Sequence, residues 1–171
     1  MEVFDLYDLN RIRTGETIER GQKPPAGRYH LVIHVCIFNQ EDQMLIQKRS
    51  ENKTGWAGLW DVSVGGAAQK GDSSQQAAHR ELMEELSLDY DFSLVRPAVT
   101  VNFPNGFDDI YLIQLDLEPS RLRLQDNEVE EVKWASQEEI KAMIQNGEFI
   151  PYHLSLIDLL FEYRFHPGLF H

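Results

Sequence analysis

The sequence contains a single cysteine and no long hydrophobic run. Because Cys36 has no second cysteine to pair with, a disulfide within the chain is excluded and a reducing, cytoplasmic setting is expected. The longest apolar run, residues 31–38, is interrupted by His34 and is too short to cross a bilayer. The N-terminal residues lack the basic and apolar regions of a secretory signal peptide. We therefore expect a cytoplasmic protein with no membrane partner.

Positive charge is also scarce, since 16 Lys and Arg residues stand against 28 Asp and Glu residues, a formal net charge of −12. A surface this acidic repels a phosphate backbone, so we expect no nucleic-acid partner. A phosphate-bearing small molecule would meet the same repulsion unless a metal ion offset it. The length of 171 residues and the hydrophobic fraction of 42% suit a compact domain with a real core, and they exclude disorder and a disulfide scaffold.

Turn residues divide the chain into an N-terminal hairpin extension, residues 1–28, and a main domain, residues 29–171. The boundary lies at a stretch with two prolines and two glycines, residues 21–27. The strands expected span residues 2–7, 11–20, 30–39, 44–49, 59–64, 93–102, 109–117 and 129–134. The helices expected span residues 73–86, 136–146 and 153–163, followed by a tail at 165–171. This order lacks a strict βαβ alternation, which favours an α/β fold with a mixed sheet and helices on both faces.

The helix expected at 73–86 carries three acidic residues close together in the sequence. Glu81, Glu84 and Glu85 occupy positions i, i+3 and i+4, so their carboxylates project from one face. Like charges at this spacing destabilise a helix by about 0.2–0.5 kcal/mol per pair, and no lysine follows four residues later to relieve them. A divalent cation between the carboxylates would offset this repulsion. Oxygen donors without a neighbouring Cys or convergent His favour Mg²⁺ or Mn²⁺ over Zn²⁺.

A solvated acidic face is the alternative interpretation of these glutamates. The preceding residues weigh against it, because Gly65 and Gly66 end an expected strand and a polar loop then leads into the helix. Glycines allow a backbone carbonyl to approach an ion or a phosphate closely. The glutamates are therefore expected next to a segment whose backbone an ion or a phosphate can approach closely.

The stretch from Gly65 to Leu88 resembles the Nudix box, G-x5-E-x7-R-E-U-x-E-E-x-G-U, in which U is an aliphatic residue. The residues in register are Gly66, Arg80, Glu81, Leu82, Glu84, Glu85 and Leu88. Two positions depart from the box, since Asp72 replaces a glutamate and Ser87 replaces the glycine that ends the helix in a left-handed turn. The resemblance implies a Nudix-type α/β/α sandwich over most of the chain.

The resemblance also implies metal-dependent attack of water on a diphosphate linkage in a nucleoside diphosphate-linked small molecule. It makes Glu84, Glu85 and the backbone carbonyl of Gly65 metal ligands, with Glu81 a further ligand or the general base. Arg80 is expected to orient a glutamate through charge-assisted hydrogen bonds. The cofactor, Mg²⁺ or Mn²⁺, would neutralise charge on the phosphoryl oxygens and lower the pKa of bound water.

Three further residues are candidates for the same site. Many Nudix relatives supply a carboxylate from a distal loop, and Glu128 is our choice here as an additional ligand or base. A solvated loop acid is the alternative for Glu128. Lys48 and Arg49, at the end of an expected strand, are candidates to bind the substrate phosphates, with an ordinary surface pair as the alternative.

Two other functions remain open. Residues 30–32 and 58–66 resemble isopentenyl-diphosphate isomerases of the same superfamily. That branch uses a cysteine just before the second glycine and a metal-binding histidine two positions later, where this chain has Gly65 and Ala67. Hydrolysis is therefore favoured over isomerisation. A non-catalytic nucleotide-sensing module is the other alternative, although it would not need all three glutamates. The N-terminal hairpin is expected either to cover the site or to build a homodimer interface.

Overall fold

The computed structural model describes residues 1–170, and His171, the end of the expected tail, lies outside them. The strands are β1 (Val3–Tyr7), β2 (Arg13–Glu19), β3 (His30–Phe38), β4 (Gln43–Arg49), β5 (Trp60–Asp61), β6 (Val64–Ala67), β7 (Val99–Phe103), β8 (Gly106–Gln114) and β9 (Val129–Ser136). The helices are α1 (Ser74–Leu86), α2 (Gln137–Gln145) and α3 (Leu154–Tyr163), with a 3-10 turn at Pro119–Arg121. No helix among residues 1–170 has the length and hydropathy needed to span a membrane.

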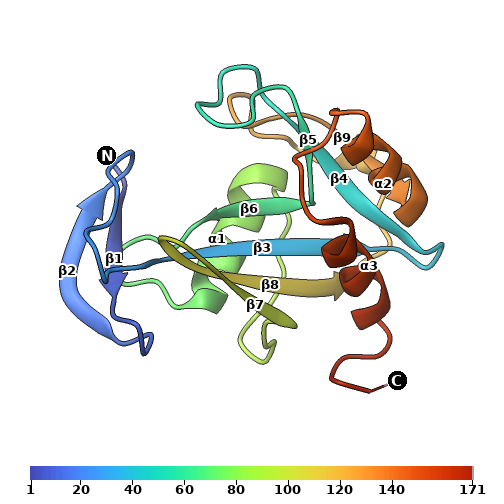
Figure 1. Ribbon diagram of the computed structural model, residues 1–171. Helices are drawn as coiled ribbons and strands as arrows, with labels where there is room; N and C mark the ends of the chain where they lie inside the picture. Colours follow the sequence, from blue (N-terminus) through green and yellow to red (C-terminus); the bar gives the residue numbers. More distant parts are fainter. Residues whose placement is uncertain (171) are drawn as a thin grey trace.

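Strand β3 is the centre of a mixed sheet (Figure 1). It pairs antiparallel with β6 and parallel with β8, and β8 pairs antiparallel with β7. β3 and β4 touch only near their connecting turn, at Phe38 and Met44. Beyond that point β4 pairs with β9 and β5 instead. The sheet thus splits into two arms, with β6 along the inner side of one of them.

The alternation of side chains along β3 builds a core on each face of the sheet. Ile33, Val35 and Ile37 pack with the buried face of α1, whereas Cys36 and Phe38 pack with α3. Figure 1 shows α1 behind the sheet and α3 in front of it. The expected α/β/α sandwich with a mixed sheet is therefore confirmed.

Both predicted capping boxes form. Ser73 caps α1 together with Gln76, and Ser136 caps α2 together with Glu139. Helix α1 ends at Ser87 in the left-handed conformation (φ 54°), where its N–H donates to the carbonyl of Met83. The serine thus adopts the turn that the Nudix box assigns to glycine, at a cost of about 1–2 kcal/mol relative to a residue without a Cβ.

Three strand predictions were wrong in their bounds, and one of them, expected at 109–117, lies three residues earlier at Gly106–Gln114. The strand expected at 59–64 is divided into β5, which pairs with β4, and β6, which pairs with β3. β6 then continues through Gly65 and Gly66, which pair with β3, instead of ending at them. Likewise, the strand expected at 93–102 begins only at Val99, since residues before it form turns and lie next to Pro97.

The N-terminal hairpin forms a separate two-stranded sheet from β1 and β2, as expected. It lies against the main domain, because Tyr7 and Tyr29 exchange backbone hydrogen bonds of 2.8 and 3.0 Å. Its apolar side chains Phe4, Leu6 and Ile18 form a small cluster with Ala67 of β6. The hairpin therefore reaches the strand that carries the two glycines.

Candidate active site

A cavity of about 180 Å³ lies between α1, β6, the loop at 50–58 and the segment before β9. Several distant parts of the chain contribute to its walls. The predicted residues that line it are Gly65, Glu81, Glu84, Glu85 and Glu128. The structure thus brings together every carboxylate that the sequence assigned to metal binding or catalysis, and we call this space the carboxylate cavity.

The two glycines of β6 make room on opposite faces of the strand. A Cβ atom built on Gly66 would lie 2.2 Å from the carboxyl carbon of Glu81. A Cβ atom on Gly65 would lie 2.5 Å from the ring of His34, its partner across the strand pair. Both distances are far below a van der Waals contact. The glycines are therefore required by close packing, with Glu81 on the α1 side and His34 on the α3 side.

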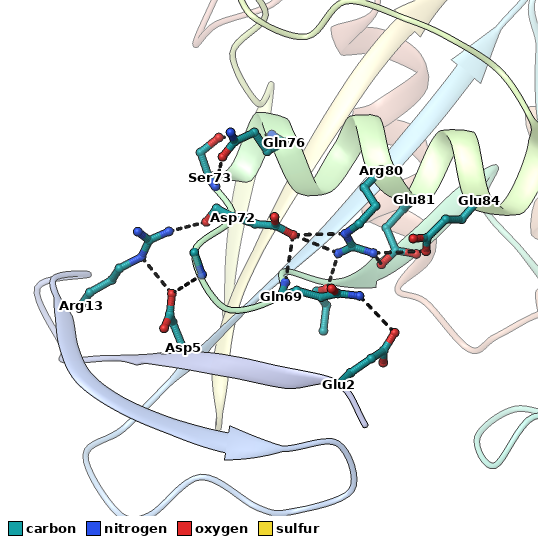
Figure 2. A network of polar contacts seen from close by, with 12 residues as sticks. Glu2, Asp5, Arg13, Gln69, Asp72, Ser73, Gln76, Arg80, Glu81 and Glu84 are labelled. Carbon is teal, nitrogen blue, oxygen red and sulfur yellow. Dashed lines mark hydrogen bonds and ion pairs between the residues drawn. The ribbon is translucent and has the colours of Figure 1, made fainter.

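Arg80 holds the glutamates of α1 in place (Figure 2). Its guanidinium donates to Glu81 at 2.7 Å and to Glu84 at 3.3 Å, and also to the carbonyl of Ala67 at 3.0 Å. It further pairs with Asp72 at 3.1 Å. No lysine follows four residues after the glutamates, but Arg80, the residue before Glu81, supplies the positive charge. Repulsion between the acids is therefore partly offset by the chain itself.

Burial changes the acidity of two of these groups. Glu85 is 4% exposed, and its burial raises the pKa of the carboxyl to about 7, although a 2.8 Å hydrogen bond from Gln47 opposes this shift. Burial also raises the pKa of Glu81, opposed by the charge and hydrogen bond of Arg80. A buried carboxylate near a second one gains strongly from a neighbouring cation. This electrostatic setting suits a divalent metal ion.

The donor set fits a hard cation, because it consists of carboxylates and the backbone oxygen of Gly65. Within residues 1–170, however, no three His, Cys, Asp or Glu side chains already enclose an ion. Glu81 and Glu84 are instead hydrogen-bonded to Arg80. Arg80 donates to Oε2 of Glu84, so Oε1 is the oxygen of that carboxylate left available to Mg²⁺ or Mn²⁺. Asp72 bonds to Arg80 and does not line the cavity.

Two cationic residues that the sequence analysis missed line the carboxylate cavity, Lys53 and Arg20. Lys53 comes from the loop at 50–58 and forms an ion pair with Glu128. Burial lowers the pKa of Lys53, and the positive charges of Arg49 and Arg20 lower it further. Arg20 lies at the end of the hairpin and pairs with Glu2 at 2.7 Å. Basic residues are few in this chain, so the position of Lys53 in a glycine-containing loop was the one sequence feature that could have indicated a phosphate-binding role.

The two cations that the sequence analysis chose lie elsewhere. Lys48 pairs with Glu130 at 3.0 Å, and Arg49 contacts Asp61 at 3.4 Å and the carbonyl of Gly55 at 2.9 Å. Neither residue lines the carboxylate cavity. Substrate binding by Lys48 and Arg49 stays a prediction, and their contacts give it no support.

The hairpin is fastened to the loop between β6 and α1, as Figure 2 shows. Asp5 accepts the N–H of Gly71 at 2.8 Å and pairs with Arg13 at 3.3 Å. Gln69 donates its side-chain amide to Glu2 at 3.3 Å. These contacts fix the strand ends that carry Glu2 and Arg20 into the cavity wall. The hairpin therefore covers one side of the site.

Comparison with known proteins agrees with this geometry. A family model described as NUDIX domain matches residues 28–154. The protein named Uncharacterized Nudix hydrolase lmo0368, from Listeria monocytogenes, is 49% identical over 152 residues, covering 89% of this chain and 90% of that protein. Isopentenyl-diphosphate Delta-isomerase 2 of Photorhabdus laumondii is 29% identical over 127 residues, covering 71% of this chain and 70% of that protein. The crystal structure of DR0079 from Deinococcus radiodurans has a TM-score of 0.74 at 27% identity, covering 93% of this chain and 97% of that one.

The matched region, residues 28–154, contains all the cavity residues except those supplied by the hairpin. It also contains the whole of α1 and the two glycines of β6. The sequence resemblance, the sandwich and the family model thus agree over most of the chain. The chain belongs to the Nudix family.

Proposed function

We propose that this Nudix-family pyrophosphohydrolase uses Mg²⁺ or Mn²⁺ to hydrolyse the diphosphate linkage of a nucleoside diphosphate-linked small molecule. The observation that carries the proposal is the convergence of Glu81, Glu84, Glu85 and Glu128 with two cationic side chains around one small cavity. Acids suit the metal, and cations suit the phosphates. A cavity with both kinds of group matches a substrate that bridges them.

Glu84, Glu85 and the carbonyl of Gly65 would hold the ion, which would neutralise charge on the phosphoryl oxygens and lower the pKa of bound water. Glu81 is then the base. Arg80 donates to its Oε1, so Oε2 is the atom that accepts the proton as water attacks phosphorus. The raised pKa of Glu81 brings its basicity closer to neutral pH, where general base catalysis is most efficient. The bond that breaks joins phosphorus to the bridging oxygen.

Lys53 and Arg20 would contact the substrate phosphates. In the structure each is paired with an acid, Glu128 and Glu2 respectively. A bound phosphate would compete with those acids for the same donors, through charge-assisted hydrogen bonds. Glu128 would then be released to act as the additional ligand or base. We also propose a cytoplasmic location, because a chain whose single cysteine, Cys36, is a free thiol suits a reducing compartment.

The test is product release from a panel of diphosphates with Mg²⁺, comparing the native protein with Glu85→Gln. The panel contains ADP-ribose, a nucleotide sugar, a dinucleotide polyphosphate and isopentenyl diphosphate. We expect metal-dependent hydrolysis that falls by about two orders of magnitude or more in Glu85→Gln. The matched control is Glu131→Gln, an exposed acid on β9, which should leave the rate unchanged.

Two outcomes would overturn the proposal. Isomerisation of isopentenyl diphosphate without hydrolysis would favour the isomerase alternative. The isomerase branch has a cysteine at the position of Gly65, and in this structure the ring of His34 occupies the space where that side chain would lie. Nucleotide binding without turnover of any diphosphate would instead favour the non-catalytic sensing module.

A further inference from the structure

Gln47 is a buried polar side chain that directly follows three buried apolar residues of β4. It is 2% exposed and lies on the same face of the strand as Leu45, which packs with α1. Buried polar groups are almost always hydrogen-bonded, because an unpaired one is costly to remove from water. The amide of Gln47 therefore needs partners inside the protein.

The amide nitrogen of Gln47 donates two hydrogen bonds. One goes to the carbonyl oxygen of Ser63 at 2.9 Å, and the other goes to Oε2 of Glu85 at 2.8 Å. A carbonyl and a carboxylate both accept hydrogen bonds, so the nitrogen of the amide, and not its oxygen, must face them. Gln47 thus joins β4 to the carboxylate of Glu85 on α1.

The sheet fixes the place of this amide. β3 and β4 separate beyond their connecting turn, and Ser63 bridges them there (Figure 1). The Ser63 hydroxyl accepts the N–H of Ile37 at 2.8 Å and donates to the carbonyl of Leu45. The backbone carbonyl of Ser63 then accepts from Gln47. Because the amide is anchored to the backbone in this way, it can hold a side chain of α1 in place.

The bond from Gln47 selects one oxygen of Glu85. Oε2 accepts from the amide, so Oε1 is the oxygen left for an ion, and Glu85 lines the carboxylate cavity. The amide is neutral, so it orients this carboxylate without supplying a positive charge in place of the ion. Arg80, in contrast, both orients and partly neutralises Glu81 and Glu84. Glu85 therefore keeps a negative charge that its hydrogen-bond partner does not offset.

We propose that Gln47 is a positioning residue for the metal site, which holds Oε2 of Glu85 so that Oε1 stays available to the divalent ion. This inference rests on the proposed function and adds a residue from β4, outside the Nudix box. Gln47 does not line the carboxylate cavity, so it acts through Glu85. Removal of a hydrogen-bond partner from a metal ligand changes metal affinity by about 10- to 100-fold.

The first experiment measures Mn²⁺ binding in the absence of substrate, from the electron paramagnetic resonance signal of the free ion. It compares native protein with Gln47→Met, which keeps the length of the side chain and removes both N–H donors. We expect the dissociation constant for Mn²⁺ to rise by about tenfold or more. Ile46→Val is the matched control, because Ile46 is the preceding residue on β4 and packs in the other core, with α3.

Thermal unfolding of both variants checks the fold, and Ile46→Val should be less stable than native protein while its Mn²⁺ affinity stays unchanged. Native affinity in Gln47→Met would overturn the inference. An equal loss of affinity in Ile46→Val would also overturn it, because a weakened core would then explain the effect. Absence of Mn²⁺ binding by native protein would overturn the proposed function, and the inference with it.

The second experiment measures hydrolysis at a series of Mg²⁺ concentrations, with a diphosphate that native protein turns over. Gln47→Met should need about tenfold more Mg²⁺ for its half-maximal rate, while KM for the diphosphate at saturating Mg²⁺ changes by less than about twofold. A raised KM with an unchanged Mg²⁺ requirement would contradict the inference. Mn²⁺ binding that Gln47→Met weakens, in a native protein that hydrolyses no diphosphate, would count against the proposed function alone.

Discussion

Arg11 donates a pair of hydrogen bonds to the buried carboxylate of Asp109, one of them at 2.9 Å. Arg11 lies in the turn of the hairpin, in the left-handed conformation (φ 62°), whereas Asp109 lies within β8 and is fully buried. Ser74 and Thr100 donate to the same carboxylate at 2.6 and 2.7 Å. This pair locks the turn of the hairpin to the main domain, while the other end of the hairpin walls the carboxylate cavity.

Removing the guanidinium should loosen this lock. Arg11→Ala leaves the buried Asp109 carboxylate with two of its partners, Ser74 and Thr100, and without its counter-ion. We expect the free energy of unfolding to fall by about 1–3 kcal/mol. Urea denaturation at neutral pH measures this change. Arg123→Ala, at an exposed site, serves as the control, and an equal loss in both variants would argue against a specific role for Arg11.

The same carboxylate should give the fold a defined pH dependence. Burial alone would raise the pKa of Asp109, but the hydrogen bonds from Arg11, Ser74 and Thr100 outweigh it, so that the pKa is lowered. A group with a lowered folded-state pKa contributes stability above its unfolded pKa, about 3.9, and loses that contribution as the pH falls through the folded value. The stability difference between native protein and Asp109→Asn should therefore shrink below about pH 4. Denaturation curves from neutral to acid pH test this, and a constant difference would contradict it.

Arg80 should act as a positioning residue. In Arg80→Gln the hydrogen bonds that orient Glu81 and Glu84 are lost, so the two carboxylates no longer hold the positions from which they would serve the ion and the water. We expect Mg²⁺ affinity and kcat to fall by about 10- to 100-fold, with little change in KM. Arg80→Lys restores the charge but not the planar fork, so it should recover only part of the loss. Calorimetric titration with Mg²⁺ separates this role from a general loss of stability, which would leave affinity per folded molecule unchanged.

The glycines of β6 provide a sharper test of close packing. Gly66→Ala places a methyl group where Glu81 now lies, so the carboxylate must move away from the carboxylate cavity. We expect activity to fall by about two orders of magnitude, since a small displacement of a catalytic group has effects of that size. Gly55→Ala is the control, because a Cβ there meets no atom within 4 Å. Full activity in Gly66→Ala would mean that Glu81 does not need its present position.

Local sequence signals predicted a large part of this molecule. The capping box at Ser73 and the spacing of Glu81, Glu84 and Glu85 depend only on neighbours within one helix, so α1 and its acidic face followed from the sequence. The pairing of Lys53 with Glu128 joins residues that are 75 positions apart, and it depends on how two loops meet. No local pattern encodes such a meeting. For the same reason the sequence indicated Lys48 and Arg49, which end an expected strand, and did not indicate Lys53 and Arg20.

The two glycines show a second limit of local signals. A Gly-Gly pair was interpreted as the end of a strand, because glycine favours turns. In the structure Gly65 and Gly66 continue β6, and their small size admits His34 and Glu81 from opposite faces. Glycine is favoured both where the backbone turns and where side chains pack closely against a strand. The sequence alone does not distinguish these two roles, because the side chains that pack on Gly65 and Gly66 come from other elements.

The N-terminal hairpin belongs to the structure that surrounds the carboxylate cavity. The match to the family model starts at residue 28, yet Glu2, Phe4 and Arg20 form part of the cavity wall. A chain that began where the family model begins would lack part of the wall of the carboxylate cavity and would expose Ala67, which Phe4 now contacts. The part of the chain that surrounds the carboxylate cavity is thus longer than the region that the family model matches. Differences between Nudix proteins in the N-terminal hairpin would alter the carboxylate cavity without any change in the Nudix box.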